Sequence, residues 1–510
     1  MKLEIAFFPL ACIIILNMFI VVKIISRFKI QKPNSKFPPG PWKLPVIGHL
    51  HHVRGLPHRS LWDLAKKHGP LMLLQLGEVP LIVVSSPKVA KEIMKTHDTV
   101  FADRPKLLAA KAGSYNYTDI VFAPFGKYWR QLRKICFQEL FSMKKVQSMW
   151  SIREEEVLNL VEKIKTMAGS PVNLSEKFIS LSNDITSRAA FGKKCKDKEA
   201  FLSLVEESMR LAGGFDLADL YPSLKILHGI SGTQHKLEII HQKLDKILQD
   251  IINEHRQNRM GKRETEKIQG NEEDVVDVLL RLQEDNDLAI AMEDDNIKAV
   301  IQDIFVAGSD TSSATVEWAL AEMMRNPRVM EKAQTEVRQV LNGKRKVDQS
   351  DINKLIYLRL VIKETLRLHP ATGLIPPRES REECEIDGYE IPKGTKIIVN
   401  AWAIGRDPEF WSNAESFEPE RFQDISIDYK GNNFEYIPFG AGRRICPGLL
   451  FGIANIELPL AQLLYHFDWK LPYGLKQKEL DMTEAFGAVV SRKTNLTLIP
   501  TIHSSFAVET

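Results

Sequence analysis

The sequence predicts a mainly α-helical fold with small β-sheets. Apolar residues recur at helical spacing through residues 147–167, 175–192, 199–212 and 234–257, and one uninterrupted helical pattern covers 294–325. Strand patterns are short, and the clearest is a pair at 71–76 and 81–84 joined by a Gly-Glu-Val-Pro turn. We find no internal repeat, so we expect one large domain over residues 42–510.

The N-terminus predicts a membrane anchor. Residues 5–22 are apolar apart from Asn17, close to the ~20 residues that a bilayer-spanning helix needs. A cleaved signal peptide is the alternative, but no small-x-small cleavage site follows the apolar core. The residues that follow, 23–36, hold five basic side chains and no acidic one, which keeps that end in the cytosol. We expect a single transmembrane helix with its basic flank at 1–32 and a proline-rich hinge at 33–41.

Charge and cysteine usage exclude two classes of protein. The net charge is +4, and six basic residues but only one acidic residue fall within 1–36, so the body is near neutral and a nucleic-acid binder is not expected. The five cysteines are odd in number and show no CxxC spacing, so a disulfide framework is not expected either. The body therefore faces a reducing compartment.

Residues 87–141 predict two helices separated by a loop. A short helix opens at Pro87 and runs to about residue 97, and residues 105–120 lack periodicity. The helix at 126–141 carries Trp129 and Arg133 one turn apart, hence on one face. Its basic residues form a cationic surface suited to an acidic partner protein. Further along, residues 258–274 are polar and charged and predict an exposed linker.

The long helix at 294–325 contains Ala307-Gly308-Ser309-Asp310-Thr311-Ser312. A glycine in mid-helix costs about 1 kcal/mol relative to alanine, so Gly308 needs a reason, such as the close approach of a flat ligand or dioxygen. Asp310 and Thr311 set a carboxylate beside a hydroxyl, a pair that can relay protons and hold a water in the groove.

A second chemical feature is a charged set near the end of the next helix, 355–368. Glu364 and Arg367 are three residues apart and so share a face, and Arg421 is the natural third member. A surface pair of this kind is worth only ~0.3 kcal/mol, so burial must give it importance.

The stretch at 438–448, Pro-Phe-Gly-Ala-Gly-Arg-Arg-Ile-Cys-Pro-Gly, organises the chain. Gly440 and Gly442 permit positive φ and let the backbone lie flat against a bulky group. Cys446 precedes an apolar helical run, whose N-terminus favours a thiolate, and Arg444 can neutralise an anion on the same ligand. No second cysteine or histidine lies at chelating distance, so a haem iron suits the loop better than zinc does.

Residues Phe439, Gly442, Arg444, Cys446 and Gly448 match the signature of the haem-thiolate monooxygenases, the cytochrome P-450 superfamily. The chain resembles this superfamily over essentially its whole length and is most similar to plant enzymes of specialised metabolism. The resemblance implies the cytochrome P-450 fold and haem b, with Cys446 as the axial thiolate and metal ligand. It further implies that the tryptophan and the arginines of the following set bind the haem propionates and that the other members contact the haem. The set is Trp129, Arg133, Arg378, Arg444, Phe439, Gly442 and Gly448. In the family, Glu364, Arg367 and Arg421 form a structural ion network, and the loop 105–120 covers the haem.

The resemblance also implies a function. We expect a membrane-anchored monooxygenase with its catalytic domain on the cytosolic face of the endoplasmic reticulum, receiving NADPH-derived electrons from NADPH–cytochrome P-450 reductase. Asp310 and Thr311 would direct protons, and a hydrophobic plant metabolite, a terpenoid in our main hypothesis, would be hydroxylated with O2. The candidate pocket is mostly apolar: Phe305, Ala307, Gly308, Leu374, Ile375, Phe486 and Val489. Relatives commonly have prolines near 371 and 373, which this chain lacks, so the substrate transfers less well than the chemistry.

Three alternatives stay open. Close relatives also hydroxylate or epoxidise indole alkaloids. A reductase-independent haem-thiolate isomerase or dehydratase is a second class, although such relatives typically lose the acid–alcohol pair that this chain keeps at Asp310-Thr311. A non-catalytic haem protein is a third class, and it would need neither an oxygen groove nor a cationic face for a reductase.

Overall fold

The computed structural model describes residues 36–503 except 195–200, 212–215, 225–231, 264–272, 286–287, 345–346 and 486, with further gaps between 201 and 211. The predicted anchor, much of the predicted helix at 199–212, and Phe486 lie outside the described residues. Among the helices within these ranges, none is both long and apolar enough to cross a membrane.

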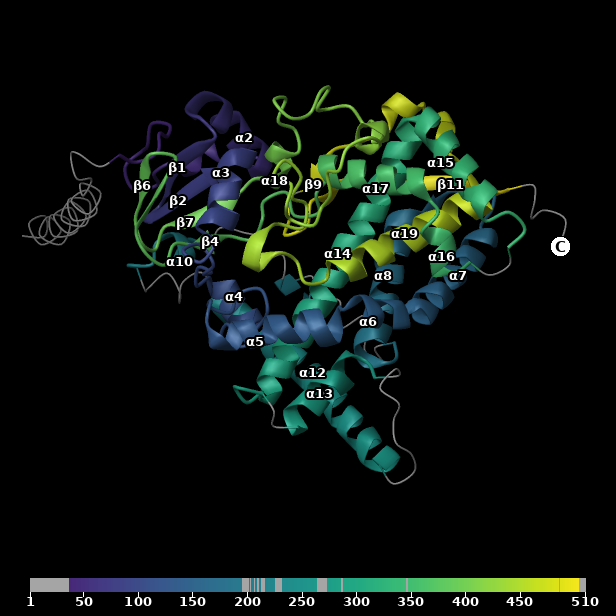
Figure 1. The fold of residues 1–510 in the computed structure, drawn as a ribbon, viewed down its shortest axis with the longest axis horizontal. Coiled ribbons are helices and arrows are strands. Elements are labelled where there is room, and N and C mark those ends of the chain that lie inside the picture. The colour runs from purple at the N-terminus through teal and green to yellow at the C-terminus, as the bar shows by residue number, and fades with distance from the viewer. Residues whose placement is uncertain are drawn as a thin grey trace, which may run out of the picture.

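The molecule has a sheet-rich side and a larger helical side, with α14 between them (Figure 1). The principal sheet has the order β1-β2-β7-β4, in which β2 and β7 are parallel and the other pairs antiparallel. Its strands are β1 (Leu71–Leu76), β2 (Val79–Val84), β4 (Arg378–Glu379) and β7 (Lys396–Val399). The predicted hairpin is confirmed, with β2 starting two residues early. Smaller sheets use β3 (Val172–Asn173), β5 (Cys384–Ile386), β6 (Tyr389–Ile391), β8 (Phe467–Lys470), β9 (Glu484–Ala485), β10 (Ser491–Arg492) and β11 (Thr497–Ile502).

Helices make up most of the described chain, as the periodicity predicts. The longer ones are α2 (Pro57–His68), α5 (Lys127–Ile135), α7 (Trp150–Lys165), α8 (Leu174–Phe191), α12 (Thr233–Arg263), α13 (Val275–Glu284), α14 (Asp294–Arg325), α15 (Pro327–Val340), α17 (Ile356–Leu368) and α19 (Leu449–His466). The short ones are α3 (Pro87–Lys91), α4 (Leu108–Gly113), α6 (Met143–Ser148), α10 (Leu217–Leu220), α16 (Gln349–Ile352) and α18 (Ala401–Ile404). Two π-helical turns, Glu92–Thr96 and Cys136–Leu140, extend α3 and α5.

Helix α14 is the centre of the helical side. Its predicted range, 294–325, is confirmed: Glu293 and Asn296 form a capping box at its start, and Pro327 follows its end. It packs against α8, α17 and α19, and their apolar faces share one hydrophobic core. The site elements on α14 are therefore held on a helix with neighbours along most of its length.

Two expectations about loops are wrong in part. Residues 108–113 within the segment 105–120 form α4, and α12 continues to Arg263, so the predicted linker at 258–274 begins as helix, while its residues 264–272 lie outside the described residues. Arg259 explains the second difference, because it donates to the carbonyl of Asp277 at 2.9 Å and to Glu284 at 3.1 Å, so this turn of α12 is bound to α13.

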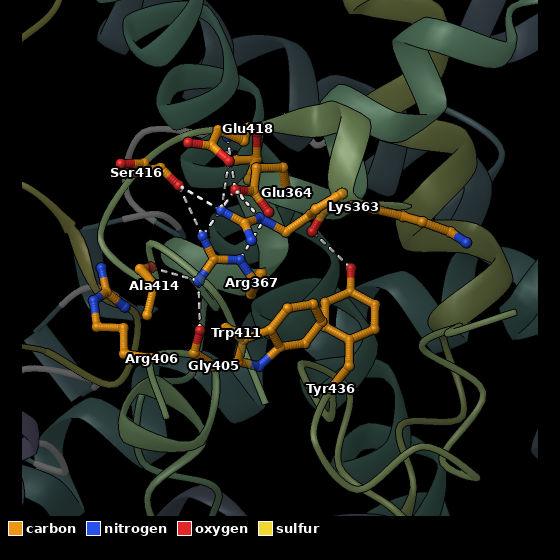
Figure 2. A network of polar contacts seen from close by, with 12 residues as sticks. Lys363, Glu364, Arg367, Gly405, Arg406, Trp411, Ala414, Ser416, Glu418 and Tyr436 are labelled. Atoms are coloured by element: carbon orange, nitrogen blue, oxygen red, sulfur yellow. Dashed lines mark hydrogen bonds and ion pairs between the residues drawn. The ribbon is translucent and has the colours of Figure 1, made fainter. Parts of the chain in front are cut away.

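Arg367 is the centre of a buried polar network that binds three loop positions to α17 (Figure 2). Its guanidinium donates to both carboxylate oxygens of Glu364 at 2.7 and 2.8 Å, and both side chains are fully buried. Its remaining donors reach loop carbonyls at Gly405 (2.6 Å), Ala414 (2.7 Å) and Ser416 (3.0 Å). One planar cation thus holds the chain between 405 and 416 against α17.

The same carboxylate also holds the following segment. Arg421 donates to Oε1 of Glu364 at 2.9 Å, and the Glu418 backbone N–H donates to the same oxygen at 2.8 Å. Further on, the Tyr436 hydroxyl donates to the carbonyl of Lys363 at 2.8 Å. Since Tyr436 stands two residues before the loop 438–448, the network determines where that loop begins.

We predict that Glu364→Ala lowers the free energy of unfolding by ~3–5 kcal/mol, because it leaves the buried Arg367 charge without its partner. The matched control is Glu418→Ala, whose side chain is 41% exposed beside Arg421 and is expected to cost at most ~1 kcal/mol. Chemical denaturation measures both. Equal losses in the two variants would contradict the importance of the buried pair.

Candidate functional site

A cavity of about 240 Å³ lies between α14, the start of α19 and the loop 438–448. Residues from six parts of the chain line it: Arg104, Ile120, Val121, Arg133, Phe141, Asp303, Ile304, Ala307, Gly308, Thr311, Ser312, Thr315, Leu366, Ala371, Thr372, Ile375, Pro376, Pro438, Phe439, Gly440, Arg444, Cys446, Pro447, Gly448, Phe451, Gly452 and Ile456. Most of this lining is apolar, with basic groups at one end and hydroxyls on α14. The sequence elements singled out at 307–312 and 438–448 therefore meet at one site.

The loop 438–448 presents Cys446 to the cavity. The Cys446 backbone N–H donates to the carbonyl of Phe439 at 3.0 Å and closes the loop. Gly440 and Gly442 have φ of 71° and 69°, and a Cβ on Gly442 would lie 1.9 Å from the backbone oxygen of Met94. Gly442 is thus required by the protein itself, at the contact with the π-helical turn Glu92–Thr96.

Gly448 is a glycine for which the protein offers no such reason. It has an ordinary φ of −86°, and a Cβ added there would meet no described protein atom within 4 Å, although the residue lines the cavity. The open space in front of it is what a bound flat group would fill.

The thiol of Cys446 differs from the sequence-based expectation in one respect. Helix α19 begins at Leu449, and a hydrogen bond with the Gly448 backbone and the charge of Arg133 both favour the thiolate. Burial has the larger effect, so the pKa of Cys446 is raised rather than lowered. A thiolate here needs a cation bound to its sulfur, which a metal supplies.

Helix α14 forms the opposite wall with Ala307, Gly308, Thr311, Ser312 and Thr315. The Thr311 hydroxyl donates to the carbonyl of Ala307 at 2.6 Å, and the Thr315 hydroxyl donates to that of Thr311 at 2.8 Å. Gly308 also has a packing reason, since a Cβ there would lie 3.3 Å from the Thr186 side chain. Asp310 is half-buried and is outside the set of described residues that line the cavity.

Four arginines gather at the basic end of the cavity. Arg104, Arg133 and Arg444 line it, and Arg378 lies against the loop, donating to Asp98 at 3.1 Å and to the carbonyl of Ala441 at 2.9 Å. Burial, and next the charge of Arg378, lowers the pKa of Arg444 to about 9. Burial and the charges of Arg444 and Arg378 lower the pKa of Arg104. These cations repel one another, so the cluster favours an anionic ligand.

The predicted propionate-binding residues divide into two groups. Arg133 donates to the carbonyl of Ile445 at 2.7 Å and so braces the residue before the cysteine. Trp129 donates its indole N–H to the carbonyl of Ile120 at 3.2 Å and stands outside the lining of the described cavity. Its ring lies under the Arg444 guanidinium, 4.3 Å away, so it supports an arginine.

The sequence reasoning missed Arg104 and Asp303. Arg104 donates to the carbonyls of Val121 (2.9 Å), Pro377 (2.8 Å) and Pro376. Asp303 on α14 accepts the backbone N–H groups of Ile120 (2.8 Å) and Val121 (3.2 Å), and burial followed by the nearby Asp119 raises its pKa. Asp303 stands one and two helical turns before Ala307 and Asp310, so the helical period was the available signal for it.

The predicted substrate pocket is only partly brought together. Ala307, Gly308 and Ile375 line the cavity, and Ala371 and Thr372 join them. Phe305 is 1% exposed and packs in the core, with its ring stacked on Phe191 at 6.1 Å. Leu374, Val489 and Gly373 also fall outside the described lining, and a Cβ on Gly373 would meet Val490 at 3.1 Å.

The residues present fit a haem. The cavity offers a buried thiol, apolar walls, an open face at Gly448 and a cluster of four arginines, of which, among the described side chains, Arg378 is the one that forms an ion pair, with Asp98. The Nε of Arg378 also has no partner in the described part of the chain. A planar iron complex with two carboxylates satisfies each of these features.

Comparisons with known proteins agree with this fit. The family model described as "Cytochrome P450" matches residues 38–499. Among curated proteins, the chain is 59% identical to the desmethyl-deoxy-podophyllotoxin synthase of Sinopodophyllum hexandrum over 98% of both chains. It is 54% identical to the premnaspirodiene oxygenase of Hyoscyamus muticus (97% of this chain, 98% of the relative) and to the germacrene A hydroxylase of Barnadesia spinosa (96% of each). A solved zebra fish cytochrome P450 with abiraterone has the same fold, with a TM-score of 0.73 and 24% identity over 88% of this chain and all of that one.

We predict opposite behaviour for two glycines of the loop. Gly442→Ala is expected to cost more than about 1 kcal/mol, since a left-handed φ is combined with a clash against Met94, and to reduce the yield of folded protein. Gly448→Ala is expected to fold normally but to carry less haem, because the added methyl enters the cavity. Thermal unfolding and haem per protein distinguish them, and normal haem content in Gly448→Ala would contradict the assignment of this open face.

Proposed function

The chain belongs to the cytochrome P450 family, and on this basis we propose that it is a membrane-anchored monooxygenase that hydroxylates a hydrophobic terpenoid. Members of the family are oxidoreductases that use haem with a cysteine thiolate ligand and electrons passed from NADPH by a reductase. The proposal rests on one observation. Cys446, arginines of the cluster and the α14 wall that carries Thr311 all line the same largely apolar cavity.

We assign the residues as follows. Cys446 would hold the haem iron through its sulfur, and Arg104, Arg133, Arg378 and Arg444 would neutralise the propionates, with Trp129 supporting Arg444. Phe439, Gly442 and Gly448 shape the loop around the ring, and Glu364, Arg367 and Arg421 hold the segment that leads to it. When bound, haem supplies the activation of dioxygen and the insertion of one oxygen atom into a C–H bond.

The chain's own side chains then have three tasks. The apolar lining excludes bulk water and orients the substrate, with Ile375, Ala371 and Ala307 facing the site. The Thr311 hydroxyl, fixed on the Ala307 carbonyl, holds a water in the groove and directs protons into it, with Asp310 as the neighbouring acid. Arg133 keeps the residue before Cys446 in position through the Ile445 carbonyl.

The terpenoid class is supported by relatives whose names state germacrene A hydroxylase and premnaspirodiene oxygenase. A second candidate is a substrate of the kind used by the desmethyl-deoxy-podophyllotoxin synthase, because that relative is 59% identical to this chain. Since Ala371, Thr372 and Ile375 contribute to the cavity, changes at these positions alter the substrate before they alter the chemistry.

The experiment is to express the full chain with a NADPH–cytochrome P450 reductase and supply sesquiterpenes, podophyllotoxin precursors and indole alkaloids. The proposal requires NADPH-dependent conversion of a terpene to a product with one added oxygen atom. Conversion of only another class would replace the terpenoid assignment. Conversion without the reductase or NADPH would instead favour the isomerase or dehydratase class.

We predict that Cys446→Ala removes the red-shifted Soret band that a thiolate-ligated haem shows when reduced with carbon monoxide. The matched control is Cys384→Ala, which changes a half-buried cysteine on β5 outside the cavity lining and should retain the band. An unchanged spectrum in Cys446→Ala would refute the ligand assignment.

The cavity also predicts which residues decide where the oxygen is inserted. Ile375→Val removes one methylene from the lining, a change worth ~1–3 kcal/mol between competing orientations, so product ratios should shift about tenfold at normal haem content. Val489 lies outside the described lining, so Val489→Ala should leave the product ratios unchanged. A shift in product ratios with Val489→Ala but not with Ile375→Val would support the pocket expected from the sequence instead.

Removing residues 1–32 is expected to release the protein from membranes in high salt while the carbon monoxide spectrum persists. The expected anchor is a separate apolar segment joined through prolines, so the domain at 42–510 should fold without it. If the truncated chain stays on membranes in salt, a second apolar surface binds them. The exposed Leu217 (53%) and Leu224 (39%) are the candidates.

A further inference from the structure

A buried carboxylate outside the cavity, that of Glu484 on β9, binds two other elements of the fold. Its Oε1 accepts the indole N–H of Trp402 on α18 at 2.9 Å. Its Oε2 accepts from Nε2 of His58 and from Nε of Arg59, each at 2.8 Å, and both of these residues belong to the first turn of α2. The Glu484 side chain is 1% exposed. One side chain thus connects three elements that are far apart in the sequence.

These three contacts depend on the negative charge of Glu484. Burial alone raises the pKa of this group, but the hydrogen bonds from His58 and Arg59 outweigh burial and hold the pKa well below its ordinary value. The group is therefore a carboxylate, which accepts hydrogen bonds and donates none. Without it, the buried indole N–H of Trp402 would lack its acceptor, and an unpaired buried donor destabilises the arrangement around it.

Trp402 also binds the segment 371–375, which we call the wall segment because three of its residues line the cavity. The backbone N–H of Trp402 donates to the carbonyl of Gly373 at 3.1 Å. A second bond comes from Val490, in the turn that connects β9 to β10, whose N–H donates to the carbonyl of Ala371 at 2.8 Å. The wall segment is thus attached to α18 and to the β9–β10 hairpin.

The wall segment packs directly against two side chains that Glu484 binds. A Cβ on Gly373 would lie 3.5 Å from Cβ of Trp402 and 3.6 Å from Cγ of His58, so both side chains are in contact with this glycine. Their rings lie 5.2 Å apart. Because Glu484 stands on the hairpin and binds Trp402 as well, it joins both attachments of the wall segment.

We propose that Glu484 is a positioning residue for ligand selection, which holds Trp402 and the β9–β10 hairpin in the places that give the wall segment its shape. Glu484 is outside the described lining of the cavity, so it acts through other residues. A merely structural role would change stability without changing which ligands fit. The inference rests on the proposed function in that haem must bind in this cavity, but it does not depend on the terpenoid class.

The test compares two iron-binding probes, imidazole and the bulkier 1-phenylimidazole, on the full-length haem-loaded enzyme, with Kd measured from the shift of the Soret band. Imidazole needs little room, so its Kd reports the haem itself, whereas the phenyl ring reports the wall segment. We expect Glu484→Ala to weaken 1-phenylimidazole binding at least fivefold relative to imidazole. Trp402→Phe keeps an aromatic ring but loses the indole N–H, and it should have the same effect.

Glu484→Gln is the conservative variant, because its amide oxygen can still accept from Trp402, and it should keep the ratio of the two Kd values within twofold of the wild type. The matched control is Glu156→Ala, which removes a buried carboxylate on α7 that binds Arg188 and Lys194 outside the cavity lining. It should lower Tm and leave the ratio unchanged.

An unchanged ratio in both Glu484→Ala and Trp402→Phe would overturn the proposal. An equal change in Glu156→Ala would also overturn it, because any loss of stability would then alter the cavity. If imidazole gives no shift even with the wild-type protein, the proposed function fails and this inference fails with it, whereas a normal imidazole shift with an unchanged ratio refutes the role of Glu484 alone.

Discussion

The buried carboxylate of Glu364 is the constraint on which the position of the cysteine loop depends. It accepts from Arg367, Arg421 and a backbone N–H, and Arg367 in turn binds the carbonyls of three loop positions. The segment 405–436 has little regular structure of its own, so these side-chain bonds replace the backbone ladder that would otherwise fix it. The charge network is therefore a scaffold for an irregular segment, and the loop 438–448 follows directly from its end.

The cavity combines two opposite requirements. Its walls are apolar, as suits a hydrophobic substrate, yet one end gathers four buried arginines whose pKa values are lowered by burial, with repulsion between the cations adding to the effect at Arg104 and Arg444. Such a cluster is unfavourable on its own and is relieved only by an anion. Burial also raises the pKa of the Cys446 thiol. The protein alone therefore lacks negative charge beside the arginines and positive charge beside the sulfur, and haem supplies both.

The sequence was sufficient to predict the long helices and the groups of residues that are recognised by a short motif. The range 294–325, the hairpin and the grouping of Glu364 with Arg367 and Arg421 depend on local periodicity and short spacing, which are readable from one chain. Arg104 was missed because its hydrogen-bond partners are backbone carbonyls, which leave no residue-type signal in the sequence, whereas Asp303 was missed although it shares the helical period of Ala307 and Asp310. Phe305 was assigned to the pocket because it shares α14 with Ala307, and only the packing of Phe191 shows that it faces the core. The pKa of Cys446 was misjudged because helix position is visible in a sequence whereas burial is not.

Asp303 holds the segment at 120–121 through its main chain alone. The carboxylate binds the N–H groups of Ile120 and Val121, while both of these residues line the cavity. A main-chain clamp is indifferent to the identity of the side chains it carries. Substitutions at positions 120 and 121 can therefore change the shape of the cavity without breaking the hydrogen bonds to Asp303. New substrates could be accommodated in this way while the fold stays the same.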